Sequence, residues 1–307
     1  MAIPVAVFDA IIYGCLFSLL SLGLTLSYMT SKVPNFAHGA FITLGAYVCY
    51  SLFRFQNISP YISAPISFMI GGAAGLTMYF LLLRPLVNRG ATVITCMIGT
   101  IAVTVLFTGI FGAYADYLAN DFKFGDSRYF LLAGQDFQVF GLKGIEIMAP
   151  VVLIAITTTL YIFLSKTKFG ISMRATVQNP SLAQLLGTNT TLVYCISWFL
   201  AGGLAALAGT LFILRLPGNP TMGTDFTIAF FAASLLGGLS SIYGAILGGL
   251  IVGAGEILAA TYISQVVGIW FAAYQPAIPM VIMVVGLIIV PQGLASLNWS
   301  RLQRRRA

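Results

Sequence analysis

The sequence consists of apolar stretches of about 20 residues, separated by short segments that carry almost all of the charge. A helix of that length covers about 30 Å at 1.5 Å per residue, which is the hydrocarbon thickness of a bilayer. Only 7% of the 307 residues are charged and 59% are hydrophobic, whereas a soluble domain has roughly 25% charged residues. The pattern excludes a soluble domain and predicts a chain that crosses a membrane several times.

The apolar runs give the positions of the expected membrane helices, which are residues 5–29, 35–53, 61–83, 91–113, 146–165, 190–214 and 276–292. Residues 226–239 are short for a crossing and end in Gly237 and Gly238, ahead of a Gly-rich helix at 242–262. Broken elements occur in membranes where protein or a cavity satisfies the backbone, so this region is either part of a translocation path or a short tilted helix. The sequence predicts an all-α polytopic integral membrane protein, a single transmembrane domain over residues 1–307 with about 8–9 transmembrane helices including a short or broken one.

The basic residues predict the orientation of the chain. If the apolar runs cross the membrane in turn, one side of the membrane carries Lys32, Arg84, Arg89, Lys166, Lys168, Arg174, Arg301, Arg304, Arg305 and Arg306. The other side receives Arg54, Lys123, Arg128, Lys143 and Arg215, together with most of the acidic residues. The side richer in Lys and Arg is cytoplasmic, which places the C-terminus inside and the segment 114–145 in an external loop. Bases that flank membrane helices are orientation signals, so the net charge of +7 does not indicate nucleic acid.

Two further features bear on processing and metal binding. Residues 1–8 contain no Lys or Arg and the apolar run extends beyond a signal-peptide core, so the first helix is expected to remain in the protein. The four cysteines, Cys15, Cys49, Cys96 and Cys195, lie singly in apolar runs without C-x-x-C spacing. They are expected to be buried side chains, with no metal site or disulfide.

The cytoplasmic segment 166–189 contains a predicted amphipathic helix. Asn179 is a suitable N-cap, Pro180 follows at the first helical position, and Gly187 is a natural stop. Leu182, Leu185 and Leu186 recur at helical spacing. This apolar stripe is expected to lie on the membrane surface, to pack on neighbouring helices, or to dock into a groove of another protein.

Seven residues of the segment 166–189 match a known motif in order and spacing: Arg174, Gln178, Asn179, Pro180, Ala183, Leu186 and Gly187. They resemble the coupling helix, which contacts the ATPase, of the LivH-type permease subunits of branched-chain amino acid ABC importers. The other matching segments are Gly23–Leu26, Asn35–Gly39, Gly45–Tyr47, Thr95–Thr104, Gly237–Ala245, Gly248–Gly249, Gly255–Glu256 and Pro291–Leu294. The last segment departs from the family, which more often has Arg between Pro and Gly. Order and spacing agree over about 280 residues.

The resemblance implies an ABC-importer permease fold and amino acid uptake by alternating access. It also implies four kinds of partner: membrane lipid, a second permease subunit (LivM-type or a second copy of this chain), two cytoplasmic ATPase subunits and an external substrate-binding protein. The chain contains no Gly-Lys dipeptide and therefore no Walker A loop. The chain is thus expected to be a transport subunit without cofactor or catalytic residues, with ATP and Mg²⁺ bound by the partner ATPases.

A zwitterionic amino acid needs polar groups for its ammonium and carboxylate and an apolar wall for its side chain. Asn35, Thr95, Thr100, Thr104 and Ser234 are the polar candidates, and Phe36, Ile98 and Phe231 are the apolar ones. His38, the only histidine, either titrates or donates a hydrogen bond to backbone groups near Asn35. Glu256 lies deep in a predicted helix and is either a pathway residue or a buried acid bonded to neighbouring helices.

Small-residue ladders predict close helix contacts. Gly71 and Gly75 form one ladder, and Gly244, Gly248, Gly249 and Gly253 form others. Such ladders usually pack helices within a subunit, but those from Gly244 to Gly253 are candidates for the interface with the second permease.

Two other functions fit parts of the sequence. Urea or a short amide is an alternative substrate, because urea importers use closely similar permeases. Asn35-Phe36-Ala37 and Asn179-Pro180-Ser181 faintly resemble the paired Asn-Pro-Ala half-helices of passive solute channels. Both segments map to the same membrane face and the second lies in a charged loop, which disfavours the channel.

Overall fold

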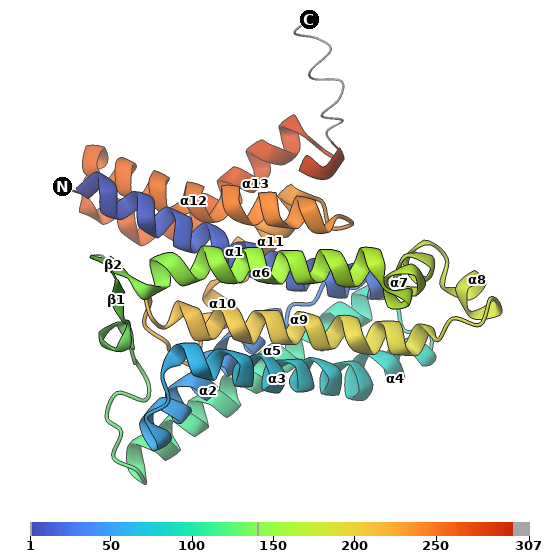
Figure 1. The fold of residues 1–307 in the computed structure, drawn as a ribbon, viewed down its shortest axis with the longest axis horizontal. Helices are drawn as coiled ribbons and strands as arrows, with labels where there is room; N and C mark the ends of the chain where they lie inside the picture. The colour runs from blue at the N-terminus through green and yellow to red at the C-terminus, as the bar shows by residue number, and fades with distance from the viewer. Residues whose placement is uncertain (1, 140, 297–307) are drawn as a thin grey trace, which may run out of the picture. The chain divides into compact units, whose positions relative to one another are not determined.

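The computed structural model describes residues 2–139 and 141–296, and this part of the chain is mostly helical (Figure 1). The first half contains α1 (Ala2–Ser31), α2 (His38–Gln56), α3 (Pro60–Met78), the π-helical turn η1 (Tyr79–Leu83), α4 (Arg84–Asn88), α5 (Val93–Asn120), η2 (Ala133–Gln135) and the strands β1 (Gln138–Val139) and β2 (Leu142–Lys143). The second half contains α6 (Gly144–Lys166), α7 (Lys168–Gln178), α8 (Pro180–Leu185), α9 (Thr190–Phe212), α10 (Met222–Asp225), α11 (Thr227–Gly237), α12 (Ile242–Val267), η3 (Ile269–Ala277), α13 (Ile278–Ile289) and η4 (Leu294–Ser296).

Seven helical segments of the described residues are long and apolar enough to cross a membrane. They are Val5–Ser31, Pro60–Asn88, Val93–Asn120, Gly144–Lys166, Thr190–Phe212, Ile242–Val267 and Ile269–Ser296. The 19-residue α2 is also long enough, about 28 Å, and is largely buried in the protein. The 11-residue α11 covers only about 16 Å, so the predicted short helix is present. These helices confirm the expected polytopic membrane protein.

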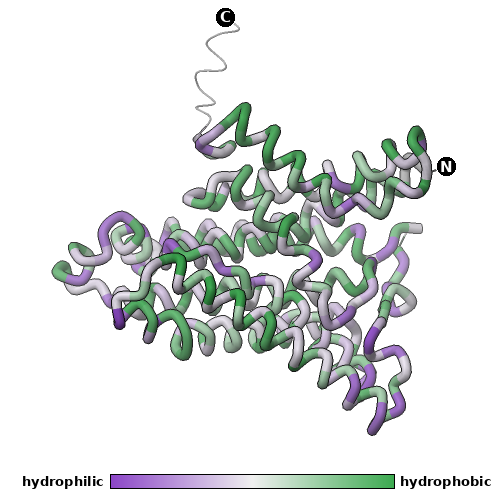
Figure 2. Tube along the Cα trace, turned by 180° about the vertical axis from the view of Figure 1, so that it is seen from behind, coloured by the Kyte–Doolittle hydropathy of each residue, from purple (hydrophilic) through white to green (hydrophobic). Residues whose placement is uncertain are grey.

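The chain divides into two compact units. We call residues 26–227 the central unit, and residues 1–25 with 228–307 the terminal unit, of which residues 2–25 and 228–296 are described. In the central unit, hydrophilic residues concentrate at the helix ends and in the connecting segments (Figure 2). This distribution is the one expected of helices whose middles lie in hydrocarbon.

Helix α9 forms the core of the central unit because glycines let α2 and α3 approach its backbone. A side chain at Gly71 or Gly75 of α3 would overlap the backbone of α9 at Gly202 and Trp198, and Gly209 packs directly on α2. Trp198 is fully buried in this contact. The predicted ladder of Gly71 and Gly75 therefore packs helices within the chain.

One end of the central unit is tied together by acidic residues. Asp126 accepts from Arg54 and Tyr50 at 2.9 and 2.7 Å, and the guanidinium of Arg128 binds Asp116 through two hydrogen bonds of 2.6 and 2.7 Å. Asp116 lies inside α5, which continues to Asn120 rather than ending at residue 113, so the expected loop 114–145 begins seven residues later than predicted. Apolar residues before Asn120 propagate the helix into the polar segment.

The opposite end of the central unit is basic. It carries Lys32, Arg84, Arg89, Lys166, Lys168 and Arg174, and the segments 26–40, 79–100 and 160–195 contain no Asp or Glu. A hollow lined by Ser31, Arg84 and Gln184 shows that the ends of α1, α4 and α8 meet here. The two groups of charged residues that the sequence assigned to opposite sides thus lie at opposite ends of the central unit. The segment 166–189 also contains a second helix, α7, that was not predicted.

In the terminal unit, α11, α12 and α13 pack around Ala232, Ala233, Leu236 and Val252. Helix α12 continues to Val267, beyond the expected end at residue 262. The last crossing begins with the 3₁₀ segment η3 at Ile269, ahead of the expected start at residue 276, because Pro276 does not exclude the tighter helix.

Candidate translocation path and coupling surface

The junction between α1 and α2 is the best-formed polar site among the expected pathway residues. The chain leaves the helix between Lys32 and Ala37, and Asn35 and His38 are completely buried. The backbone N–H of Phe36 donates to Thr100 Oγ1 at 3.2 Å, and that hydroxyl donates to the carbonyl of Met97 at 2.8 Å. Thr100 of α5 therefore supplies a hydrogen-bond acceptor for a backbone N–H at the break between the two helices.

The side chain of Asn35 is unusual for a buried amide. Among the described residues, neither its Oδ1 nor its Nδ2 has a hydrogen-bond partner. Leaving a buried polar group unpaired costs about 1–3 kcal/mol, and such groups in folded proteins need an explanation such as a binding role. Asn35 therefore offers a donor and an acceptor to a polar molecule at this junction. His38 begins α2, and its ring meets Phe41 edge-on at 6.5 Å.

The other expected residues of α5 do not join this site. Ile98 is 62% exposed and lies about 200° around the helix from Thr100, so the two cannot line one surface. Thr95 is exposed and shares a 3.0 Å hydrogen bond with Thr92, the N-cap of α5. The structure thus places Ile98 on the outer face of α5 and Thr95 in the helix cap, so neither lies at the Asn35 junction, and their expected pathway roles stay predictions. Thr104 lies one turn beyond Thr100 and donates to its carbonyl at 3.0 Å.

The remaining pathway candidates belong to the terminal unit. Ser234 of α11 is buried and donates to Ser21 Oγ of α1 at 3.1 Å. Phe231 is half-buried beside Phe230. Glu256 of α12 is 5% exposed and accepts from Gln275 of η3 at 3.0 Å, while its second oxygen has no partner among the described residues. Ser234 and Glu256 are therefore hydrogen-bonded to neighbouring helices. For Glu256, this is the second of the two roles expected from the sequence, that of a buried acid bonded to neighbouring helices.

The four glycines expected at a subunit interface face helices of the same chain. A side chain at Gly244 or Gly248 would overlap the backbone of α11, and one at Gly249 or Gly253 would overlap α1 at Ser18 and Tyr13. All four are buried. The expected interface role is corrected accordingly, because these small residues allow α12 to pack closely on two helices of its own unit.

The helix α8 forms as predicted. Asn179 Oδ1 accepts from the N–H of Leu182 at 3.0 Å, Pro180 occupies the first turn, and Gly187 adopts the left-handed conformation with φ of 82°. Ala183 is buried and anchors the helix.

The opposite face of α8 is apolar and open. Leu185 and Leu186 are 85% and 75% exposed, and Leu182 is also exposed. Of the other expected coupling residues, Arg174 donates to the carbonyl of Leu164, and Gln178 is exposed at the end of α7. The exposed leucines therefore lie at the surface of the basic end, outside the packed helices of the central unit.

Comparison with known proteins gives the family. A family model described as the permease component of the branched-chain amino acid transport system matches residues 6–291. The chain belongs to this permease family. No solved structure matches the chain.

Relatives of this permease are similar over nearly their full length. The probable branched-chain amino acid transport permease protein LivH of Methanocaldococcus jannaschii is 41% identical over 96% of this chain and 93% of its own. The high-affinity permease protein LivH of Salmonella typhimurium is 25% identical over 94% of this chain and 93% of its own. The high-affinity permease protein BraD of Pseudomonas aeruginosa is 25% identical over 92% of each chain.

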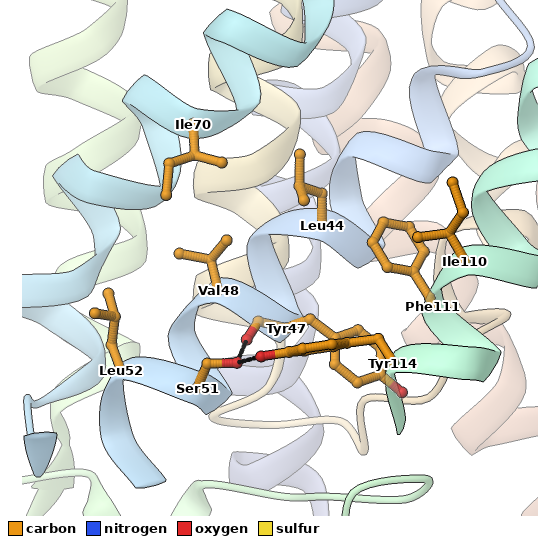
Figure 3. Close-up of a pocket in the computed structure, with 9 residues that line it drawn as sticks. All are labelled: Leu44, Tyr47, Val48, Ser51, Leu52, Ile70, Ile110, Phe111 and Tyr114. Carbon is orange, nitrogen blue, oxygen red and sulfur yellow. Dashed lines mark hydrogen bonds between the residues drawn. The ribbon is translucent and has the colours of Figure 1, made fainter. Parts of the chain in front are cut away.

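The permease also contains a hollow that its sequence did not reveal. A space of about 380 Å³ lies between α2, α3 and α5, surrounded by Leu44, Val48, Leu52, Ile70, Ile110 and Phe111 (Figure 3). Its polar groups are already paired, since Ser51 Oγ and the Tyr114 hydroxyl are 2.8 Å apart and Tyr47 donates to the carbonyl of Ser127. The hollow therefore offers no counter-group to a zwitterion, and the Asn35 junction remains the better candidate.

Proposed function

We propose that this permease is the membrane-spanning subunit of an ATP-binding-cassette importer that takes up branched-chain amino acids. The observation that carries the proposal is the 41% identity to a LivH-named permease over 96% of the chain. The helices long enough to cross a membrane and the family model over residues 6–291 support a transport role rather than an enzymatic one.

The partners follow from the same proposal. The permease pairs with a second, LivM-type permease or a second copy of itself, binds two cytoplasmic ATPases through α8, and receives its amino acid from an external binding protein. The ATPases bind ATP and Mg²⁺, and the permease binds no cofactor. The exposed Leu182, Leu185 and Leu186 support this contact, because an apolar helix face beyond the bundle suits a groove on another protein. The basic end faces the cytoplasm, together with the C-terminus.

The mechanism is alternating access. ATP binding closes the ATPase pair and moves α8, and this motion opens the membrane helices toward the external binding protein. The amino acid enters from the external side and passes Asn35 on its way to the cytoplasm, and the amide of Asn35 can pair with its ammonium or carboxylate. ATP hydrolysis restores the inward-facing state.

Reconstitution tests the function. The importer is assembled in vesicles with its ATPases and binding protein, and uptake of labelled leucine is measured with and without ATP. We expect ATP-dependent accumulation that unlabelled isoleucine and valine inhibit and urea does not. Accumulation that only urea inhibits would indicate a urea importer instead. Leucine flux through the chain without ATPases would indicate a passive channel.

A further inference from the structure

A second hollow lies at the basic end of the central unit and takes no part in the proposed path. It has a volume of about 300 Å³, and its lining includes Ser31, Arg84, Asn88, Gln184, Thr191 and Tyr194. These residues come from α1, α4, α8 and α9, so the site exists only where four helix ends meet. We call it the basic hollow.

The polar groups of the basic hollow include one cation and several side chains that can donate hydrogen bonds. Hydroxyls of Thr191 and Tyr194 and the amide of Asn88 face the space, whereas the Ser31 hydroxyl already donates to the carbonyl of Ser27 at 2.7 Å. Among the described residues, no acidic side chain lines the hollow. Arg84 forms no salt bridge with any residue in the described part of the chain, and its guanidinium lies 5.6 Å from the ring centre of Phe80. A guanidinium with several hydroxyl and amide donors is well suited to a phosphate group.

The position of Arg84 depends on a local irregularity. The turn η1 is π-helical, and the backbone N–H of Arg84 donates to the carbonyl of Tyr79, five residues earlier. Pro85 follows and has no N–H to continue a regular α-helix. A π turn adds one residue and rotates the following side chains by about 100°, and such turns are frequent at functional sites.

The location favours a lipid as the source of the phosphate. Pro60–Asn88 is one apolar helical segment, and Arg84 lies near its end, at the depth of the head groups. Val33, Leu83 and Val87 line the same hollow, and Leu81, one turn toward the membrane centre, is 77% exposed. An acyl chain can therefore run along α3 from a head group held at Arg84.

We propose that the basic hollow binds the phosphate of an anionic phospholipid. The guanidinium of Arg84 pairs with the phosphate oxygens, and the hydroxyl and amide groups donate to the remaining lone pairs. Basic pockets between membrane helices on the cytoplasmic side are a recognised kind of lipid site. This binding requires only that the chain spans a membrane, so it stands or falls separately from the proposed substrate.

The test compares Arg84→Gln with Arg89→Gln in the full chain purified in mild detergent. Arg89 is an exposed base at the end of α4 that does not line the hollow, so it controls for general attraction to anionic lipid. Native mass spectrometry measures binding of phosphatidylglycerol and of phosphatidylcholine. We expect Arg84→Gln to weaken phosphatidylglycerol binding about tenfold, because a hydrogen bond to a charged group is lost, while Arg89→Gln binds like the wild type.

Three further results decide the proposal. Equal loss in both variants would overturn it, because only surface charge would then matter, and so would unchanged binding in Arg84→Gln. Inorganic phosphate added at the concentration of the lipid distinguishes the sources, and displacement of phosphatidylglycerol by phosphate alone would assign the hollow to a soluble phosphate compound. If Arg84→Gln does not fold, Thr191→Val with Tyr194→Phe removes two donors, and unchanged binding there would contradict the proposal equally.

Discussion

At the scale of single residues, the feature that organises the central unit is the hydrogen bond from the backbone N–H of Phe36 to the hydroxyl of Thr100. The break between α1 and α2 leaves the N–H of Phe36 without a helical acceptor, and Thr100 of α5 supplies one. The same break buries Asn35, whose amide has no partner among the described residues. A hydroxyl on one helix and an amide on a neighbouring loop thus form a polar site inside an apolar bundle.

Replacing Thr100 with Val should damage both the fold and transport. The N–H of Phe36 loses this acceptor at a partly buried position, which costs up to about 1–3 kcal/mol. We expect a lower unfolding temperature in detergent and a severalfold loss of leucine uptake in vesicles. Thr104→Val is the control, because the hydroxyl of Thr104 donates to the carbonyl of Thr100 within its own helix. Equal effects of the two substitutions would remove the special role of Thr100.

Replacing Asn35 with Leu separates binding from stability. The substitution removes two polar atoms that have no partner in the described chain, so the unfolding temperature should stay the same or rise. If Asn35 pairs with the amino acid, uptake should fall by tenfold or more, as expected when a polar contact of about 1.4 kcal/mol is lost. Normal uptake by a stable Asn35→Leu variant would exclude Asn35 from the path.

At the scale of helices, small residues decide which elements touch. Helix α9 packs against α2 and α3 because Gly45, Gly71, Gly75, Gly202 and Gly209 let the backbones meet. In the terminal unit, glycines of α12 do the same against α1 and α11. Apolar side chains gain little from leaving lipid for a helix surface, so close packing of this kind takes the place of the hydrophobic effect.

Two glycine substitutions test this packing. Gly71→Ala places a methyl group against Ala206 and the carbonyl of Gly202, and overpacking of this kind costs about 1–3 kcal/mol. Gly109→Ala adds the same methyl group to α5, where no described atom outside the adjacent backbone of α5 lies within 4 Å of it, and should stabilise the helix by up to about 1 kcal/mol. Thermal unfolding of the purified chain measures both. A Gly71→Ala variant as stable as Gly109→Ala would contradict the packing described for α3 and α9.

The helix α8 gives the prediction for coupling. Leu186 is 75% exposed, so Leu186→Ser should leave the chain folded while weakening the contact with the ATPase. We expect ATP hydrolysis to continue and leucine uptake to fall, which is measured as molecules transported per ATP. Ile171→Ser, at a 60% exposed position on α7, is the matched control. The same loss in both variants would extend the contact to the whole segment 166–189, and normal uptake by Leu186→Ser would remove α8 from the mechanism.

At the scale of the whole molecule, charge separates the two ends of the central unit. Acidic residues and their ion pairs lie at one end, and the bases at the other end form no salt bridge within the described part of the chain. This asymmetry predicts that the basic end faces the cytoplasm, because Lys and Arg are usually retained on the cytoplasmic side.

Labelling in intact cells checks the orientation. A membrane-impermeant maleimide should modify Gly125→Cys, at the acidic end, and should not modify Lys166→Cys until the cells are opened. Three of the four native cysteines are buried and the fourth is half-buried, so the unmodified chain gives the background. The reverse pattern of labelling would invert the topology and remove α8 from contact with a cytoplasmic ATPase.

The sequence predicted the helices well because hydropathy and length report directly on burial in lipid. It also predicted the caps of α8, since Asn179, Pro180 and Gly187 act within one turn of the chain. The ends of α5 and α12 were wrong, because helical hydrogen bonding continues past the point where hydropathy falls. Ile98 was assigned to the path by its neighbours in the sequence, whereas the rotation of α5 turns it away from Thr100.

By itself, the sequence determined that the chain crosses a membrane, where its helices lie and which ends carry the bases, because these properties depend on local composition. Only the tertiary structure decided that Thr100 bonds to Phe36 and that the glycines of α12 pack on helices of the terminal unit. It also decided that Arg84, Gln184 and Tyr194 line one hollow. The residues that meet in each case are far apart in the chain. Their contact depends on the rotation of each helix about its axis, which packing sets and hydropathy does not record.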